Sequence, residues 1–479
     1  MARLLVAHGT VVTQDPDRDV IEDGAVAVDG DTIAAVGPTA AVRDEFDPER
    51  TIDASGKVVM PGLVNTHTHV SDILLRGYDE GGRALYDWLF NVKQPGIAEM
   101  TAEEHELAAA LYCAEALSAG VTTFVENDAE IPLGELEPIE TKLHTYRTAG
   151  VRSIYARGVR DLPPDEGYLA LVERITAREP SVDHPDQELY VEPLDDWLDE
   201  LDGLYGDYHG AADGRCGVWV APIVVEGMTD RGLRETYRFA EERDVMTTIH
   251  TAEAPVQTGE ELSPIEYLRN VGSLGEHALL GHCVQVDDRD VRMLARTDTR
   301  VAHNIASNMA LGNGFAPVPS MRAHGVTVGM GTDNATLSDT VNPLADLRLA
   351  GMAHKGHHTD PDVVTAQSAL DMVTIEAARS IRRGDDLGSL ERGKQADIAV
   401  LDFASARLTP APDVVRALVY QTLGTEVETV ICDGEAVVED GRPVGIAEAY
   451  PDLYHRAGRA AERVATAAGI AESRSHESG

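Results

Sequence analysis

The sequence predicts an α/β protein: a (β/α)8 TIM-like barrel with a small β-sandwich domain formed by both chain termini. Three observations predict this fold class. Apolar strands alternate with helical segments through the middle of the chain, short strands mark both ends, and several apolar strands end in titratable residues. An open, doubly wound sheet is the alternative, but no G-x-G-x-x-G pattern follows the first strand of the middle region.

Short strands are predicted at both ends of the chain. Residues 1–58 contain "GAVAVDGDTIAAVG", in which apolar runs surround Asp-Gly, a signal for a hairpin. The same pattern returns in residues 386–446, for example in "VETVICDGEAVVEDGRP". We therefore expect these two segments to form one β-sandwich. Residues 447–479 are expected to form a helix that ends in a disordered tail.

The middle region, residues 59–385, is expected to be a metal-dependent catalytic barrel. Its candidate strands are "VVMPGLVNTHTH", "TTFVEN", "RSIYARG", "CGVWVAPIVV", "VMTTIH", "ALLGHC", "RVAHNIASN" and "VTVGMGTD". Helical segments such as "TAEEHELAAALYCAEALSAG" separate most of them. An acidic stretch, "REPSVDHPDQELYVEPLDDWLDELDGLYGDYHGAADG", interrupts this pattern before the fourth strand, and we expect it to pass over the barrel.

The charge of the chain excludes some classes of partner. Asp and Glu number 82 against 40 Lys and Arg, so the formal net charge is −42. Such a surface repels nucleic acid and anionic membranes. Many acidic residues with only five lysines are typical of proteins from salt-loving organisms, in which high salt screens the repulsion.

The sequence also predicts a cytoplasmic protein that does not enter a membrane. No run of 18 apolar residues is present, and the N-terminus becomes polar too early for a secretory signal peptide. The four cysteines lie far apart and form no CxxC pair, which suits a reducing compartment.

One short motif suggests a metal site. "NTHTH" places His67 and His69 two residues apart on a strand, so both imidazoles point to the same face. Imidazole pairs of this kind bind metal ions. Two structural or surface histidines would give the same pattern, so the motif is weak by itself.

Titratable residues at the ends of other strands strengthen this interpretation. They are His250 and Glu253 in "TTIHTAE", His282 in "LLGHC" and Asp333 in "VGMGTD". In a barrel, the carboxyl ends of the strands converge on the catalytic face, so these side chains are expected to meet. A Glu253 salt bridge at the rim and a structural role for His282 are the alternatives.

Several motifs resemble one family. "VVMPGLVNTHTH", "IHTAE", "GHCV", "GTDN" and "GSLERGKQADIAVLD" resemble the amidohydrolase superfamily, in the branch of cytosine, guanine and S-adenosylhomocysteine deaminases. "YDWLFNV", "LGNGFAPVP" and "GTDNATLSDTVN" are similar to its atrazine chlorohydrolase and melamine deaminase-like group. The resemblance extends from about residue 5 to about residue 445 and favours the same barrel fold.

The resemblance implies a single divalent metal ion, Zn²⁺ or alternatively Fe²⁺. The ligands that it implies are His67, His69, His250 and Asp333. Relatives with two metal ions use a carboxylated lysine on the fourth strand, and "CGVWVAPIVVEG" contains no lysine. The resemblance therefore favours a mononuclear site over that of a binuclear cyclic-amide hydrolase.

The resemblance also implies a mechanism in which metal-bound hydroxide attacks a ring carbon. Glu253 would carry a proton from the water to a ring nitrogen, and His282 would orient the nucleophile. Asp333 would be both ligand and proton acceptor. An inactive binding or scaffold protein of the same fold is the non-enzymatic alternative.

The substrate expected from this comparison is a small heterocycle. Ile97 replaces the side chain with which S-adenosylhomocysteine deaminases grip the ribose, and Leu337 replaces a serine that assists dechlorination next to Asn334. We therefore expect an aminohydrolase that deaminates an N-heteroaromatic ring of purine, pyrimidine, pterin or triazine type. Removal of chloride from a chloro-s-triazine is the first alternative, and a methylthioadenosine- or S-adenosylhomocysteine-type nucleoside deaminase is the second.

The resemblance also proposes contacts for the substrate and an assembly. The expected substrate contacts are Trp88, Ile97, Glu126, Glu226, Asn308, Asn334 and Leu337. Asn308 lies in "HNIASN", which also offers partners that could orient metal ligands. Relatives are often homo-oligomers, so a dimer or hexamer is expected.

Overall fold

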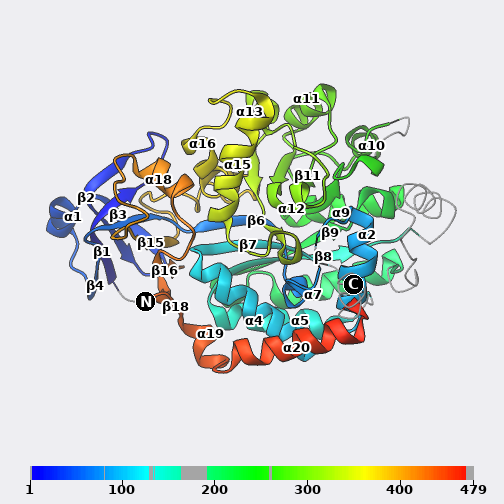
Figure 1. The fold of residues 1–479 in the computed structure, drawn as a ribbon, viewed down its shortest axis with the longest axis horizontal. Helices are drawn as coiled ribbons and strands as arrows, with labels where there is room; N and C mark the ends of the chain where they lie inside the picture. Colours follow the sequence, from blue (N-terminus) through cyan, green and yellow to red (C-terminus); the bar gives the residue numbers. More distant parts are fainter. Residues whose placement is uncertain are drawn as a thin grey trace, which may run out of the picture.

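Two nine-stranded sheets organise the chain in a computed structural model (Figure 1). The structure describes residues 3–79, 81–128, 133, 135–162, 191–257 and 262–470. Part of the predicted acidic excursion and the predicted C-terminal tail lie outside these residues. Within them, no helix is both long enough and apolar enough to cross a bilayer.

The first sheet is a parallel barrel, which confirms the predicted fold class. Its strands are β6 (Leu63–His69), β7 (Val121–Asp128), β8 (Arg152–Val159), β9 (Cys216–Pro222), β10 (Thr247–Thr251), β11 (Ala278–His282), β12 (Arg300–His303), β13 (Val328–Met330) and β14 (Asp333–Asn334). Each strand pairs with the next in chain order up to β13, which pairs with β12. β14 begins three residues after the end of β13 and pairs with β6, so these two short strands together close the barrel as its eighth strand.

Helices separate the barrel strands and cover them on the outside. They are α4 (Ala102–Ser118), α5 (Leu136–Ala149), α7 (Leu194–Tyr208), α8 (Ala211–Gly214), α9 (Asp230–Arg243), α10 (Pro264–Val271), α11 (Asp288–Thr297), α12 (Ile305–Ala310), α13 (Val318–Ala323), α14 (Ala335–Ser338), α15 (Pro343–His358), α16 (Ala366–Asp371) and α17 (Ile375–Ser380). Local sequence fixes several of their ends. Thr101 and Glu104 form a capping box at the start of α4, and Gly150 ends α5 in the left-handed conformation.

The segment between β6 and α4 folds into short turns over the barrel. It contains the 3₁₀-helix η1 (Ser71–Leu75), α2 (Leu85–Trp88), the π-helical turn η2 (Leu89–Lys93) and α3 (Gln94–Ala98). Two further 3₁₀-helices, η4 (Val225–Gly227) and η5 (Pro255–Gln257), follow β9 and β10. Single π-helical turns are rare and are frequent at functional sites.

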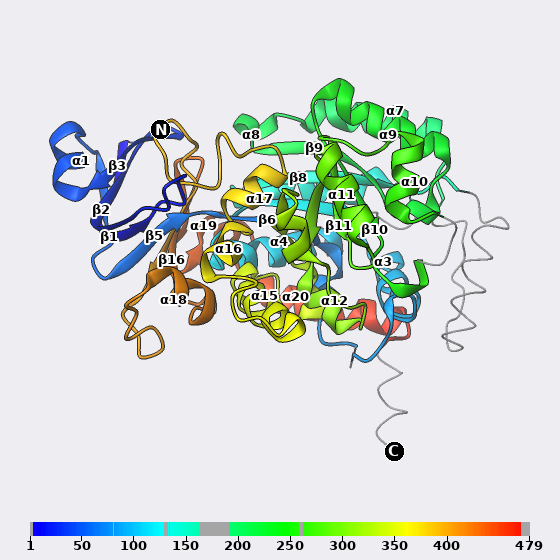
Figure 2. The same ribbon diagram turned by 90° about the horizontal axis from the view of Figure 1, so that it is seen from above.

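The second sheet contains strands from both ends of the chain, as predicted. Its strands are β1 (Arg3–Val12), β2 (Val20–Asp29), β3 (Thr32–Pro38), β4 (Arg50–Asp53), β5 (Lys57–Pro61), β15 (Ile398–Asp402), β16 (Val427–Cys432), β17 (Glu435–Glu439) and β18 (Arg442–Pro443). β15 pairs with β5, which joins the N-terminal and C-terminal halves. Figure 2 shows this sheet at one end of the molecule, beside the barrel.

The remaining helices are α1 (Thr39–Glu45), α18 (Val414–Tyr420), α19 (Val444–Ala449) and α20 (Leu453–Ala467). α20, red in Figure 1, runs along α4. Val464 and Ala465 of α20 pack in one apolar cluster with Leu75, Trp88 and Val92. The C-terminal helix therefore supports the short turns between β6 and α4 from outside.

Candidate metal centre

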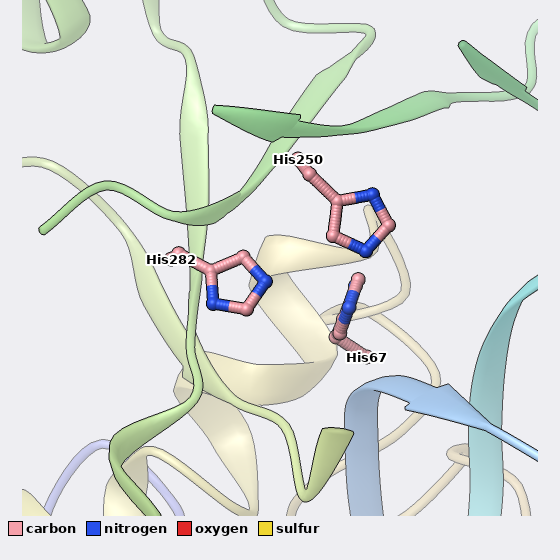
Figure 3. Close-up of side chains that lie close together, drawn as sticks. All are labelled: His67, His250 and His282. Atoms are coloured by element: carbon pink, nitrogen blue, oxygen red, sulfur yellow. The ribbon is translucent and has the colours of Figure 1, made fainter. Parts of the chain in front are cut away.

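Five titratable side chains meet at the carboxyl ends of four barrel strands. His67 and His69 come from β6, His250 from β10, His282 is the last residue of β11, and Asp333 begins β14. Figure 3 shows the rings of His67, His250 and His282 converging on one space. The sequence prediction that these strand ends meet agrees with this arrangement, because parallel strands in a barrel end on the same face.

The distances among these side chains suit a single ion. The Nε2 atoms of His69 and His250 are 3.2 Å apart, and Asp333 Oδ1 lies 3.3 Å from His69 Nε2 and 3.5 Å from His67 Nε2. Two sets of possible ligand atoms lie within 4.8 Å of one another: those of His67, His250 and His282, and those of His67, His69 and Asp333. His67 belongs to both sets.

Hydrogen bonds at Nδ1 orient two of the imidazoles, and Asn304 Nδ2 also lies 3.4 Å from Nε2 of His282. The Nδ1 atom of His250 lies 2.5 Å from the carbonyl oxygen of Ile223, and Nδ1 of His282 lies 2.9 Å from Asn308 Oδ1. Since both oxygens can only accept, each Nδ1 donates its hydrogen, and each neutral ring keeps a lone pair on Nε2. Asn308 thus orients His282 in the structure.

Electrostatics favours neutral histidines beside an ionised aspartate. Burial lowers the pKa of His67, His250 and His282, and it lowers the pKa of His69 to about 3. Burial opposes ionisation of Asp333, but the adjacent His67 and His69, whose Nε2 atoms lie 3.5 Å and 3.3 Å from its Oδ1, outweigh burial and hold the pKa of Asp333 well below its usual range.

The residues present fit a divalent metal ion. Neither ring nitrogen of His67, which is fully buried, has a hydrogen-bond partner among the described residues. An unpartnered buried nitrogen is costly unless a cation or another group engages it. Neutral imidazole nitrogens with one carboxylate oxygen are a suitable donor set for Zn²⁺ or Fe²⁺.

A protonatable carboxyl group adjoins this cluster. Glu253 Oε2 lies 3.6 Å from His282 Nε2, and Oε1 accepts a hydrogen bond from Asn313 Nδ2 at 3.2 Å. The backbone N–H of Glu253 donates to Gln257 Oε1 at 2.7 Å, which fixes the loop after β10. Burial, together with the charge of Asp333, raises the pKa of Glu253 to about 8. Glu253 can therefore both hold and release a proton near neutral pH.

A cavity opens onto the cluster. Its lining includes His69, His250, Glu253, His282 and Asp333, with apolar and aromatic side chains around them: Leu85, Tyr86, Trp88, Leu89, Ile97, Leu133, Ile223 and Val224. Three predicted substrate contacts lie on this wall: Trp88, Ile97 and Asn334. A largely apolar cavity with a few polar groups is the usual form of a site for a small molecule.

Seven polar side chains on the wall were not predicted from the sequence: Ser71, Asp72, Lys93, Gln94, Asn127, Asp128 and Gln257. Asp72 and Lys93 come from the short turns after β6, where no periodic pattern points to a common face. Asn127 and Asp128 end β7, so their position at a strand end was a signal that could have identified them.

Glu126 requires a correction, because it does not lie on the cavity wall. Its Oε1 accepts a hydrogen bond from Lys142 Nζ at 2.8 Å, and its Oε2 accepts one from the Tyr146 hydroxyl at 2.6 Å. Both partners lie on α5, outside the barrel. Side chains alternate along a strand, so the neighbouring Asn127 faces the cavity instead.

Three other expected contacts are also placed elsewhere among the described residues. Asn308 bonds His282, as described above. Glu226 Oε2 accepts a hydrogen bond from Gln257 Nε2 at 3.4 Å, behind the cavity wall. Leu337 packs in the apolar cluster that contains Trp88. These residues can affect the substrate only through the neighbours that they support.

Lys142 gives a stability prediction. Its fully buried ammonium contacts the carboxylates of Glu126 and Asp128. Lys142→Met would leave these two carboxylates without that ammonium, and we expect a loss of about 3–5 kcal/mol in the free energy of unfolding. Chemical denaturation measures this loss. The control Lys57→Met, which breaks a more exposed pair with Glu428, should cost less than about 1 kcal/mol. Equal losses would contradict the prediction.

Gly331 gives a second stability prediction. A Cβ atom at Gly331 would lie 2.5 Å from Asn304 Oδ1 and 2.5 Å from the carbonyl oxygen of His67. Gly331→Ala should therefore cost about 1–3 kcal/mol in the free energy of unfolding, since the packed site must move. Gly356 of α15 is the control, because a Cβ there meets no atom within 4 Å. Thermal melting should show a lower Tm for Gly331→Ala and an unchanged or higher Tm for Gly356→Ala.

Comparison with known families places most of the chain in one family model. Residues 58–437 match the model described as "Amidohydrolase family". Residues 24–46 match a model described as an imidazolonepropionase-like composite domain of bacteria. The first match includes the whole barrel and the five clustered side chains.

Individual relatives are similar over nearly the whole chain. An S-triazine hydrolase of Gordonia rubripertincta is 32% identical over 448 residues, which cover 92% of this chain and 91% of the relative. A 5-methylthioadenosine/S-adenosylhomocysteine deaminase of Symbiobacterium thermophilum is 35% identical over 447 residues, covering 92% of this chain and 94% of the relative. The structure of an atrazine chlorohydrolase variant from Arthrobacter aurescens, complexed with zinc and atraton, has a TM-score of 0.84 at 26% identity and covers 97% of this chain and 100% of that chain.

Proposed function

The chain belongs to the amidohydrolase family, and from that premise we propose that it is an aminohydrolase that deaminates an N-heteroaromatic ring of purine, pyrimidine, pterin or triazine type. Its class is that of hydrolases acting on C–N bonds. The observation that carries the proposal is the position of Glu253, a buried carboxyl group with a raised pKa, beside a convergent histidine and aspartate cluster.

The metal ligands that we propose are His67, His69, His250 and Asp333. When bound, a divalent ion supplies the Lewis acidity that makes water a nucleophile near neutral pH. His282 lies within reach of both Glu253 and Asp333, and its Nε2 lone pair can accept a hydrogen bond from the attacking water. This chain therefore supplies both the ligand set and a group that orients the nucleophile.

Glu253 and Asp333 transfer the protons in the proposed reaction. In the proposed reaction, Glu253 takes one proton from water and gives it to a ring nitrogen as the oxygen bonds to the ring carbon. Asp333 then takes the second proton of the former water and passes it to the exocyclic nitrogen. The C–N bond breaks, ammonia leaves, and the ring carbon retains the oxygen. Both carboxyl groups are regenerated in their starting states.

Chloride release from a chloro-s-triazine is the second candidate. Asn334, which the resemblance links to dechlorination, lies on the cavity wall and donates from Nδ2 to Asp333 Oδ1 at 2.8 Å. The serine expected as its partner is replaced by Leu337, which cannot form a hydrogen bond and packs against the apolar cluster that contains Trp88. Deamination therefore remains the better-supported reaction.

A substrate screen tests the proposed function. Purified protein would be assayed for ammonia and chloride release from aminopurines, aminopyrimidines, pterins, amino- and chlorotriazines, and adenosine-type nucleosides. Concentrated potassium acetate would supply the high ionic strength without a chloride background. Ammonia release from at least one free heterocycle supports the proposal. Chloride release alone, or deamination of nucleosides alone, would contradict it.

A further inference from the structure

One lysine on the cavity wall has no anionic partner among the described residues. Lys93 ends the π-helical turn η2 and lies on the cavity wall, half-buried, with Nζ 5.7 Å from the centre of the Trp88 ring. No carboxylate oxygen of the described residues lies within 4 Å of Nζ. Its side chain lines the same cavity as His69 and Glu253. Lys93 is therefore close to the reaction centre.

The other four lysines all have partners. Lys57 and Lys394 pair with Glu428 and Glu391, Lys142 contacts two carboxylates, and Lys355 donates to the Tyr420 hydroxyl. Acidic residues outnumber basic ones by 82 to 40 in this chain. An unpaired lysine in the cavity is thus not explained by a shortage of carboxylates.

An unmatched acceptor lies in the same cavity. Asp72 is 1% exposed, and its Oδ2 accepts hydrogen bonds from the Thr336 hydroxyl at 2.8 Å and the Thr336 backbone N–H at 3.3 Å. Its Oδ1 has no hydrogen-bond partner among the described residues. Burial raises the pKa of Asp72 to about 6, and the charge of Lys93 offsets part of this effect although the two groups form no ion pair within 4 Å. Both groups line the cavity that opens onto the metal cluster.

A ligand that fills this space must satisfy both groups. When a ring enters, it displaces water from Lys93 and from Asp72 Oδ1, and burying either group without a partner costs free energy. Trp88, Leu89 and Ile97 offer apolar contact to the faces of a ring but no polar partner for the ammonium. The compensating charge has to come from the ligand.

We propose that the substrate is an amino-heteroaromatic compound that carries an oxyanion substituent, which Lys93 binds, while a ring or exocyclic N–H of the substrate donates to Asp72 Oδ1. The oxyanion is a carboxylate on the ring or a phosphate carried by a substituent of the ring. The proposal rests on the proposed function only for the nature of the ring. Binding of the oxyanion by Lys93 can be measured whether or not the compound is turned over.

Matched ligand pairs test this inference directly. Isothermal titration would compare aminopyrimidine, aminopurine, pterin and aminotriazine carboxylates with the corresponding carboxamides, and adenosine 5′-phosphate with adenosine. Wild-type protein is expected to bind an anionic member about 10- to 100-fold more tightly than its neutral partner, the usual value of a charge-assisted contact. The pair that shows this preference identifies the oxyanion as carboxylate or phosphate.

Variants of Lys93 assign the preference to this side chain. Lys93→Met should remove the preference, and Lys93→Arg should retain most of it because the charge remains. Lys355→Met is the matched control, since it removes one lysine charge distant from the cavity lining and should leave the preference unchanged. No preference in the wild type, or a preference that persists in Lys93→Met, would overturn the inference.

The outcomes also separate this inference from the proposed function. Ammonia release from neutral rings without any anion preference would leave the aminohydrolase proposal intact and overturn the role of Lys93. A preference for anions that depends on Lys93, without ammonia release from any compound, would support the role of Lys93 and overturn the aminohydrolase proposal. If Lys93→Met lowered kcat equally for both members of a pair and left their KM ratio unchanged, Lys93 would act on Glu253 rather than on the substrate.

Discussion

Glu253→Gln is expected to lower kcat for ammonia release by about 10²- to 10⁴-fold, the range typical for loss of a general acid–base group. Glutamine preserves the size of the side chain, and its Oε1 can still accept the hydrogen bond from Asn313 Nδ2. It cannot take a proton from water or deliver one to a ring nitrogen. The loss should therefore appear in kcat, while substrate binding changes less.

Two controls accompany this measurement: a variant that loses the same charge elsewhere on the chain, and a determination of the metal content. Glu276→Gln makes the same chemical change at an exposed position, between α10 and β11, and should retain wild-type activity. Metal content determined by elemental analysis should be the same in wild type, Glu253→Gln and Glu276→Gln, because Glu253 belongs to neither set of clustered ligand atoms. Full activity in Glu253→Gln would show that another group moves the proton.

The barrel could be predicted from the sequence because each strand is buried on both faces. Strands such as β9 (CGVWVAP) and β11 (ALLGH) are buried almost throughout, and they form nearly continuous apolar segments between helices. The eighth strand was harder to define, since Gly331 and Thr332 interrupt it between β13 and β14. That both termini contribute to one β domain followed from the repeated hairpin patterns at the two ends, whereas the order of its strands was not predicted.

The metal cluster was predictable for a related reason, whereas the rest of the cavity was not. His67 and His69 share a face through the two-residue period of β6, and the other residues stand at strand ends, which a barrel gathers. On β7 the resemblance proposed Glu126 as a substrate contact, whereas its carboxylate bonds Lys142 of α5, and complete burial on both faces of the strand hides which side is the interior. Lys93 was missed because a π-helical turn has no distinctive sequence pattern.

Removal of His67 is expected to have the largest effect on the metal centre, since this residue belongs to both sets of clustered ligand atoms. His67→Ala should bind less than about one tenth of an equivalent of zinc after gel filtration, and its activity should fall by more than about 10³-fold, because the catalytic nucleophile depends on the ion. Excess zinc should raise the Tm of the wild type, because a ligand that binds only the native state stabilises that state by about 2.7 kcal/mol at 100 times its Kd. Excess zinc should not raise the Tm of His67→Ala. His324→Ala, at an exposed residue whose Nδ1 contacts Ser320 of its own helix, should behave as wild type.

The same experiment on His282 distinguishes between the two sets of ligand atoms. If His67, His69, His250 and Asp333 hold the ion, His282→Ala should keep about one equivalent of zinc and lose activity, because only the orientation of the nucleophile is affected. If the ion instead lies among His67, His250 and His282, His282→Ala should lose zinc as completely as His67→Ala. Retention of zinc by His67→Ala with unchanged affinity would contradict both assignments, since His67 is a ligand in each of them.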